Sequence, residues 1–289
     1  MGALHAGLTA ALFLAPPAPD TTPSPFATPA TRVIVERAMA RLHSEDASVR
    51  DYRARIRYRL SVSVGRRRWG RSPFAAVEEQ EGQLAWQLPN DVRVDIEGRR
   101  QRSASSSIQL QSVFDQPWFV PRGVGDSIRI FSDEFPAVAP LHPLASEGPS
   151  WYRYALIDSI RISAPGGPPL QLYQVTVAPS RAGISLITGH LWLDAATGEV
   201  VRMAFRYVGT SAWVRPEGET RRDTSDASRA NRWINRVLSL DADLEYAREP
   251  GGHWMPYRQT ISGRVSIPVT SDLAIWRSEE RRVGKECRS

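Results

Sequence analysis

Cysteine and lysine are almost absent from this sequence. The one cysteine, Cys287, and the one lysine, Lys285, both lie within the last thirteen residues. A single cysteine cannot form an internal disulfide, and the rest of the chain has no thiolate to serve as a nucleophile or a metal ligand. These scarcities exclude disulfide-rich domains, cysteine-dependent enzymes and thiolate metal sites from the main part of the chain.

Motifs of nucleotide-dependent and triad chemistry are also missing. The sequence has no P-loop, no strand–GxGxxG–helix unit and no Gly-x-Ser-x-Gly elbow. The histidines His43, His142, His190 and His253 are far apart, and none has a partner at metal-ligand spacing. There is no βαβ rhythm and no repeat of fixed period. We therefore predict no catalytic residue, no metal and no cofactor.

The two ends of the chain differ from its middle. Residues 1–18 contain an uncharged apolar run that is too short to span a membrane, so we expect a secretory signal peptide, with a disordered apolar tail as the alternative. Residues 19–29 form a proline-rich linker. Residues 277–289 resemble a translated sequencing adapter, and we expect a non-native tail after a domain cut short at Trp276; a genuine charged C-terminus is the alternative. The formal net charge of +6 falls to +4 without this tail, which holds five basic and three acidic residues.

The most regular pattern in the sequence runs from Tyr52 to Val64. Its even positions are apolar or aromatic and its odd positions are arginine or serine. This alternation predicts a β-strand of about 43 Å with an apolar dry face and a polar wet face. A strand of that length needs long partner strands and an apolar cover for its dry face.

The wet face of this strand carries Arg53, Arg55, Arg57 and Arg59. A nucleic-acid platform would need aromatic side chains on the same face as these bases, but the aromatic residues lie on the opposite face. We therefore expect no nucleic-acid partner. Acidic residues on neighbouring strands would balance the arginines, and contact with anionic lipid head groups is the alternative.

One helix and several further strands are predicted around this segment. The helix covers Thr31–His43, and we expect it to pack on the dry face of 52–64. Asp194 and Gly198 predict a type I turn with a bulge inside a hairpin over 187–207. Residues 115–150 form a long irregular stretch that would serve as a lid or as a plug for an open end of the sheet. The remaining strands are predicted at 76–88, 91–97, 152–162, 170–177, 238–246 and 254–269.

Together these elements predict a mainly β fold over residues 30–276. We expect a long antiparallel meander that forms a half-open barrel, with the one N-terminal helix packed in its concave face. The dry face would then be an apolar trough, or simply the core beneath the helix. The candidate trough residues are Ile56, Tyr58, Leu60, Val92, Val94, Ile96, Leu191, Leu193, Met203 and Phe205.

The order of elements resembles the lipoprotein-localisation half-barrel superfamily of LolA and LolB. Residues 150–265 are more specifically similar to a bacterial outer-membrane family of unknown function, in which such a domain precedes a membrane β-barrel. The similar stretches are WYRYALIDSI, LQLYQVTVAPSRAGISLITGHLWLDAATGEVVRMAF and INRVLSLDADLEYAREPGGHWMPYR. The small β-sandwich often found ahead of this domain is missing. The resemblance implies export to the periplasm or to the periplasmic face of the outer membrane, and no catalytic residues.

Three functions follow from these observations. The first is a non-enzymatic cell-envelope domain that binds lipid, or the acyl chains of a lipoprotein, in the trough. The second is a structural periplasmic domain of an outer-membrane β-barrel protein, without a small ligand. The third is an uncharacterised hydrolase, which would require His142, His190 or His253 to meet a carboxylate in a pocket.

Overall fold

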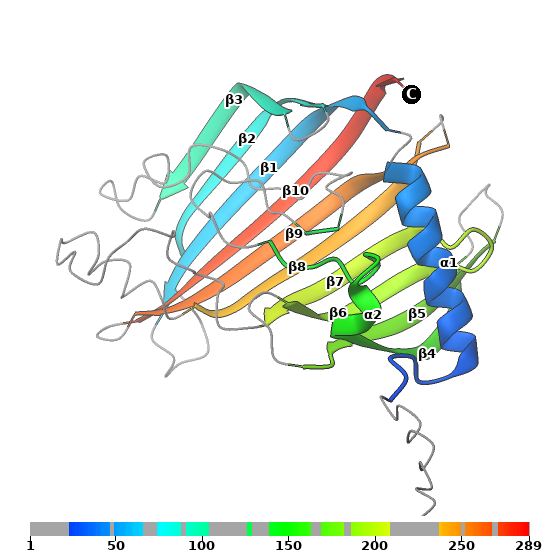
Figure 1. Cartoon of the computed structure of the whole chain (residues 1–289). Helices are drawn as coiled ribbons and strands as arrows, with labels where there is room; N and C mark the ends of the chain where they lie inside the picture. Colours follow the sequence, from blue (N-terminus) through cyan, green and yellow to red (C-terminus); the bar gives the residue numbers. More distant parts are fainter. Residues whose placement is uncertain are drawn as a thin grey trace, which may run out of the picture.

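Figure 1 shows the computed structural model of the chain. The structure describes residues 23–46, 49–65, 74–87, 91–103, 126–128, 139–162, 169–181, 186–208, 237–249, 252–267 and 271–288. The expected signal peptide and the first part of the linker lie outside these ranges. The elements are α1 (Pro29–Asp46), β1 (Asp51–Gly65), β2 (Phe74–Gln87), β3 (Asp91–Ser103), α2 (Gly148–Trp151), β4 (Tyr152–Ile162), β5 (Leu170–Pro179), β6 (Leu186–Asp194), β7 (Val200–Val208), β8 (Val237–Arg248), β9 (Trp254–Ile267) and β10 (Ser271–Arg288).

The strands form a single antiparallel sheet in the order β3-β2-β1-β10-β9-β8-β7-β6-β5-β4. Every strand lies beside its neighbours in sequence, as in a meander, except that β3 and β4 are far apart and β1 pairs with β10. Among the described residues, β3 and β4 do not pair with each other, so the sheet stays open with two edges. The helix α1 crosses one face of this sheet (Figure 1). The expected fold class, an open antiparallel meander with one N-terminal helix on its inner face, is confirmed.

Strand β1 shows the alternation that the sequence predicts. From Tyr52 to Leu60 the even positions are buried and the odd positions are exposed. On the wet face, Arg55 lies 3.1 Å from Glu81 and 3.8 Å from Glu97. The expected neutralisation by neighbouring acids is therefore present. Exposed pairs of this kind contribute about 0–1 kcal/mol each, so burial of the other face contributes more to stability.

Helix α1 lies elsewhere on the sheet than the sequence suggested. Its buried side carries Val35 and Ala38, and the hydroxyl of Thr31 accepts a hydrogen bond from the backbone N–H of Leu156 in β4 at 3.3 Å. Arg37 donates to the carbonyl of Ala195 in the β6–β7 turn at 3.1 Å. The expectation that α1 packs on β1 is therefore corrected: hydrogen-bonding groups on β4 and on this turn fix the helix there.

The β6–β7 hairpin has the predicted turn. Gly198 has φ +80°, a conformation that glycine adopts without steric cost, and its N–H donates to the carbonyl of Asp194 at 2.8 Å. The carboxylate of Asp194 accepts hydrogen bonds from the N–H of Ala196 and the hydroxyl of Thr197. The predicted hairpin and the positive φ of Gly198 in its turn are confirmed.

A register shift in β4 reverses the face of the residues that follow it. In β4, Leu156 pairs with Val175 and Asp158 with Gln174, so Ile157 is an extra residue and is 52% exposed. Regular alternation would place Tyr152, Tyr154 and Leu156 on one face with Ile160 and Ile162. The bulge moves the last two to the other face, because each extra residue inverts the alternation.

Strand β10 includes most of the expected non-native tail. It pairs with β1 along its whole length, from Asp51 opposite Arg288 to Gly65 opposite Asp272. Strand pairing uses backbone groups that every residue except proline carries, so this position is independent of the origin of the segment. The foreign origin of 277–289 stays a prediction.

Candidate functional site on the dry face of the sheet

The buried apolar residues of the dry face form two clusters. The helix-side cluster covers β4–β8, parts of β1, β2 and β9, and the inner side of α1. The β3-side cluster covers the other parts of β1 and β2, next to β3. The β3-side cluster consists of Val49, Tyr52, Ala54, Ile56, Leu84, Trp86 and Met255, with Val92 and Val94 packed against it. The helix-side cluster includes Val35, Ala38, Tyr58, Leu60, Ile128, Leu144, Tyr152, Tyr154, Leu191, Leu193, Met203, Phe205, Leu244 and Ile261.

The ten candidate trough residues all lie on the dry face, but not together. Six belong to the helix-side cluster, namely Tyr58, Leu60, Leu191, Leu193, Met203 and Phe205. Ile56, Val92 and Val94 belong to or pack on the β3-side cluster, and Ile96 lies half-buried next to it in the same strand. A ligand-lining role for these residues stays a prediction.

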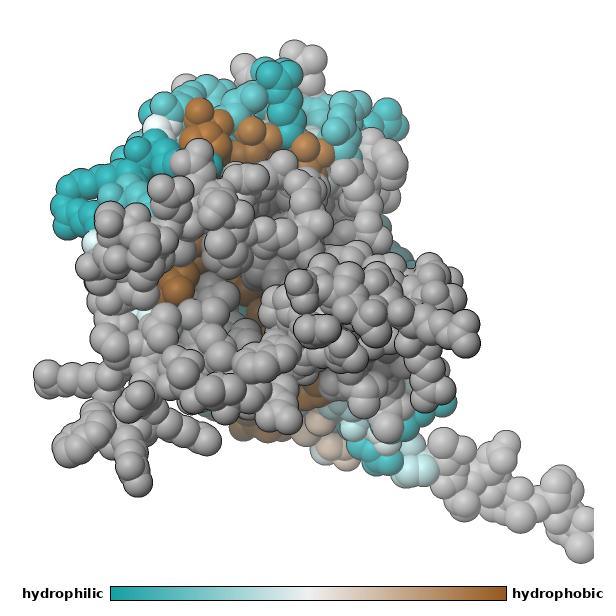
Figure 2. Space-filling model, turned by 90° about the vertical axis from the view of Figure 1, so that its left-hand side faces the viewer, coloured by the Kyte–Doolittle hydropathy of each residue, from teal (hydrophilic) through white to brown (hydrophobic). Residues whose placement is uncertain are grey.

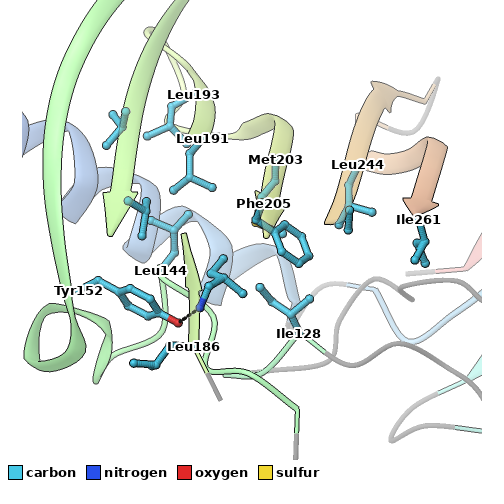
Figure 3. Packing of buried hydrophobic residues seen from close by; sticks show 14 of the residues in the cluster. Ile128, Leu144, Tyr152, Leu186, Leu191, Leu193, Met203, Phe205, Leu244 and Ile261 are labelled. Atoms are coloured by element: carbon cyan, nitrogen blue, oxygen red, sulfur yellow. Dashed lines mark hydrogen bonds between the residues drawn. The ribbon is translucent and has the colours of Figure 1, made fainter. Parts of the chain in front are cut away.

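The helix-side cluster is filled by the protein itself. Figure 3 shows Leu144 and Ile128 among the side chains of Leu191, Met203 and Phe205. Both Leu144 and Ile128 come from the irregular stretch for which the sequence left a lid or a plug open, and both are fully buried. In its described part this stretch therefore acts as a plug.

Two tyrosines of β4 hold this plug in place. The hydroxyl of Tyr152 donates to the carbonyl of Leu141 at 2.7 Å, and that of Tyr154 donates to the carbonyl of Pro143 at 2.5 Å. Burial raises the pKa of Tyr152 to about 12 and raises the pKa of Tyr154 further. Both hydroxyls therefore remain protonated and able to donate.

A buried carboxylate fixes α1 over the helix-side cluster. Glu199 is 3% exposed. Its Oε1 accepts hydrogen bonds from Arg41 of α1 at 3.0 Å and 2.5 Å, and its Oε2 accepts from the hydroxyl of Thr197 at 2.7 Å and from the indole N–H of Trp254. One carboxylate thus joins the helix, a hairpin turn and β9. This contact could not be predicted from the sequence, because Glu199 follows a turn and acidic residues beside turns are commonly solvated.

Helix α1 does not cover the β3-side cluster. None of its residues comes from α1. Tyr52 and Trp86 stack with ring centroids 5.1 Å apart, and β3 continues the apolar face with Val92, Val94 and Ile96, all half-buried. Figure 2 looks onto this side of the molecule and shows hydrophobic side chains in a row between hydrophilic ones. The apolar face therefore reaches the β3 edge of the sheet.

Two buried polar residues on the dry face were missed from the sequence. Glu78 is fully buried and Gln80 is 4% exposed. They share the parity of Leu84 and Trp86 in β2, which was the available signal, but a run of glutamate and glutamine suggested an irregular, solvated strand. Arg99 of β3 pairs with Glu78 at 3.1 Å.

His190 and His253 lie apart from the other histidines, whereas His142 lies near His43, whose Nε2 is 3.6 Å from a carboxylate oxygen of Asp126. His142 accepts a hydrogen bond from the backbone N–H of Leu144, His190 lies against Trp192, and His253 lies in the turn between β8 and β9. Within the described ranges, no three His, Cys, Asp or Glu side chains are grouped so that they could hold a metal ion. In that same part of the chain, neither helix has the length and hydrophobicity to cross a bilayer.

Comparisons with known proteins give matches among solved structures alone. No family model and no curated protein matches the sequence. An outer-membrane lipoprotein-sorting protein domain from Vibrio parahaemolyticus is 10% identical, with a TM-score of 0.29 over 88% of this chain and 95% of that one. A LolA superfamily protein from Nitrosomonas europaea is 10% identical, with a TM-score of 0.25 over 85% and 93%. A chain of the MucA/MucB complex of Pseudomonas aeruginosa is 13% identical, with a TM-score of 0.21 over 86% of this chain and 94% of that one. All three TM-scores are below 0.5.

Proposed function

We propose that this chain is a non-enzymatic domain of the cell envelope that holds an apolar chain, from a lipid or a lipidated partner, on the β3 side of its dry face. The observation that carries the proposal is the extent of the apolar surface. It continues past the area under α1 to the β3 edge, where Val92, Val94 and Ile96 are half-buried.

The two clusters differ in what they can offer to a ligand. The helix-side cluster is occupied by α1 and by the plug residues, so a ligand there would have to displace side chains that are already buried. At the β3 edge, apolar side chains are still partly accessible. Covering such a side chain contributes about 1.5–3 kcal/mol at most, which is ample for micromolar binding when several are covered.

The envelope location rests on the sequence. It is supported by the apolar run in residues 1–18 and by the resemblance of residues 150–265 to outer-membrane proteins. A carrier of apolar chains is a function that needs no catalytic group, in agreement with the separate positions of His142, His190 and His253.

A displacement assay tests this function. A fluorescent fatty-acid analogue is titrated into the folded protein, and an unlabelled long-chain lipid is then added to displace it. We expect saturable binding, and about a tenfold increase in the dissociation constant in Ile96→Ser, since one apolar contact is lost. Val33→Ser is the matched control, because Val33 is a 55% exposed apolar residue on α1. No binding to folded protein, or equal effects of the two substitutions, would overturn the proposal.

A further inference from the structure

A row of polar residues crosses the dry face between the two apolar clusters. Strand register aligns these residues: Gln80 of β2 lies opposite Tyr58 of β1 on one side and Arg99 of β3 on the other. On the far side of β1 the row continues through position 279 of β10 to Gln259 of β9. Gln80 and Gln259 are both 4% exposed. We call this set the polar row.

A bulge in β3 is what completes the polar row. Ile96 pairs with Gly82 and Gly98 with Glu81, so Glu97 is the extra residue in this strand. The shift brings Arg99 opposite Gln80, onto the dry face, although regular alternation would place an odd-numbered residue on the wet face. Arg99 then reaches Glu78 with its Nε 3.1 Å from Oε1.

Two buried oxygen atoms lack a hydrogen-bond partner: one on Gln80, in the polar row, and one on Glu78, beside the row. Oε1 of Glu78 accepts from Arg99 and also from the amide nitrogen of Gln80 at 2.6 Å. By contrast, Oε2 of Glu78 and Oε1 of Gln80 are buried without a hydrogen-bond partner in the described part of the protein. Buried polar atoms are nearly always paired, because leaving one unpaired costs about 1–3 kcal/mol. Both of these atoms are acceptors, so the missing partner is a donor.

An apolar track leads away from these two atoms. Next to the polar row, the dry face carries the rows Ile56–Gly82–Ile96, Ala54–Leu84–Val94 and Tyr52–Trp86–Val92. Rows on one face are about 6.6 Å apart, so the three rows give about 20 Å of apolar surface. The middle position of the first row is glycine, and a Cβ there would lie 2.3 Å from the carbonyl oxygen of Asp95. The row nearest the acceptors therefore has no side chain at its centre.

We infer that the ligand of this face is an amphipathic molecule whose head group donates hydrogen bonds, an ammonium or a hydroxyl group, to Glu78 and Gln80. Its apolar chain lies along the rows towards Trp86 and Val92. A carboxylate head would bring acceptors to acceptors and is disfavoured. This inference rests on the proposed function and adds the polarity of the head group.

The test compares single-chain compounds that differ in the head group alone. Dodecylamine, dodecanol and laurate are used at pH 7 to displace the fluorescent fatty-acid analogue. The amine and laurate are kept below their critical micelle concentrations, and dodecanol below its solubility limit. We expect the amine and the alcohol to displace it at concentrations at least tenfold lower than laurate. Gln80→Met keeps the side-chain length and removes the acceptor, and should reduce this preference at least fivefold.

Gln83→Met is the matched control, since Gln83 lies in the same strand on the exposed wet face. It should leave the head-group preference unchanged. Equal displacement by the three compounds, or a preference for laurate, would overturn the inference and leave the proposed function standing. Displacement by none of them would count against the proposed function itself. If Gln80→Met fails to fold, the order in which the three compounds displace the probe from the unaltered protein still tests the inference.

Discussion

Arg41 of α1 and Glu199 after the β6–β7 turn form an ion pair across 158 positions of the sequence, with an N–O distance of 2.5 Å. The carboxylate side chain is 1% exposed and the guanidinium side chain 38%. Arg41, Thr197 and Trp254 therefore take the place of water around the Glu199 carboxylate. The pair acts as the attachment point of the helix.

Removing this carboxylate should loosen the helix. We expect Glu199→Ala to lower the free energy of unfolding by about 3–5 kcal/mol, because Arg41 and Trp254 then lose a buried acceptor. Glu199→Gln keeps one acceptor oxygen and should cost less. Urea denaturation followed by circular dichroism measures both.

A double-mutant cycle with Arg41→Ala isolates the pair itself. We expect a coupling energy of about 1–3 kcal/mol, since the two side chains are in direct contact. Arg37→Ala is the control on the same helix, because Arg37 contacts the carbonyl of Ala195 rather than a carboxylate. If the effects of Glu199→Ala and Arg41→Ala on the free energy of unfolding were additive, the ion pair would not stabilise the position of the helix.

His142 should make the protein less stable in mild acid. Burial and the positive charge of nearby His43 lower the pKa of His142 to about 4, from its usual 6.5. Between about pH 6.5 and 4 the unfolded chain binds a proton at this ring that the folded chain does not. The free energy of unfolding therefore falls as the pH falls through this window, by at most about 3 kcal/mol.

His142→Asn removes the titration and keeps an acceptor for the N–H of Leu144. Denaturation at a series of pH values should give a steeper loss of stability for the unaltered protein than for this variant between pH 6.5 and 4. Parallel curves for the two proteins would rule out a contribution from His142.

Gly189 should tolerate no side chain. A Cβ there would lie 2.1 Å from the carbonyl oxygen of Ala204 and 2.7 Å from the Cα of Phe205, both in the backbone of β7. We expect Gly189→Ala to cost at least about 1–3 kcal/mol, because the two strands must separate. Gly98→Ala is the control: a Cβ there meets nothing within 4 Å, and the substitution should be neutral or stabilise by about 0.5–1 kcal/mol. Thermal unfolding compares them.

Replacing Arg202 by lysine should lower the stability of the protein slightly. Its Nε and terminal nitrogen donate to the two carboxylate oxygens of Asp243 at 2.9 and 2.6 Å, and its guanidinium lies 4.8 Å from the ring centroid of Trp192. A lysine cannot form this two-point contact. We expect Arg202→Lys to cost about 0.5–1 kcal/mol in urea denaturation. Arg206→Lys is the control, since Arg206 is more exposed and has a single close contact to Asp241; an equal cost would contradict the two-point contact.

Strand faces could be read from the sequence wherever alternation was strict. The faces of β1 and the turn after Asp194 follow from period and from the need for glycine at Gly198. Faces were misassigned beyond Leu156, because a single extra residue inverts the pattern and leaves no mark in composition. The bulge at Glu97 was hidden for the same reason.

Neighbour relations across the sheet could not be read in this way. Periodicity tells which face a side chain occupies but not which strand lies beside it, so the position of α1 and the β1–β10 pairing were not predicted. The polar row was not predicted, because the burial of Glu78 and Gln80 depends on the strands that lie beside β2, and periodicity does not identify those strands. The candidate trough was therefore located on the correct face, but its division into two parts was not.

The pairing of β1 with β10 has a consequence for biosynthesis. The three N-terminal strands leave the ribosome early, yet among the described strands they are joined to the rest of the ladder through β10, which is translated after the other nine. Until that segment emerges, the inner edge of β1 stays open to other chains, including copies of itself. A holding chaperone would be most valuable in that interval.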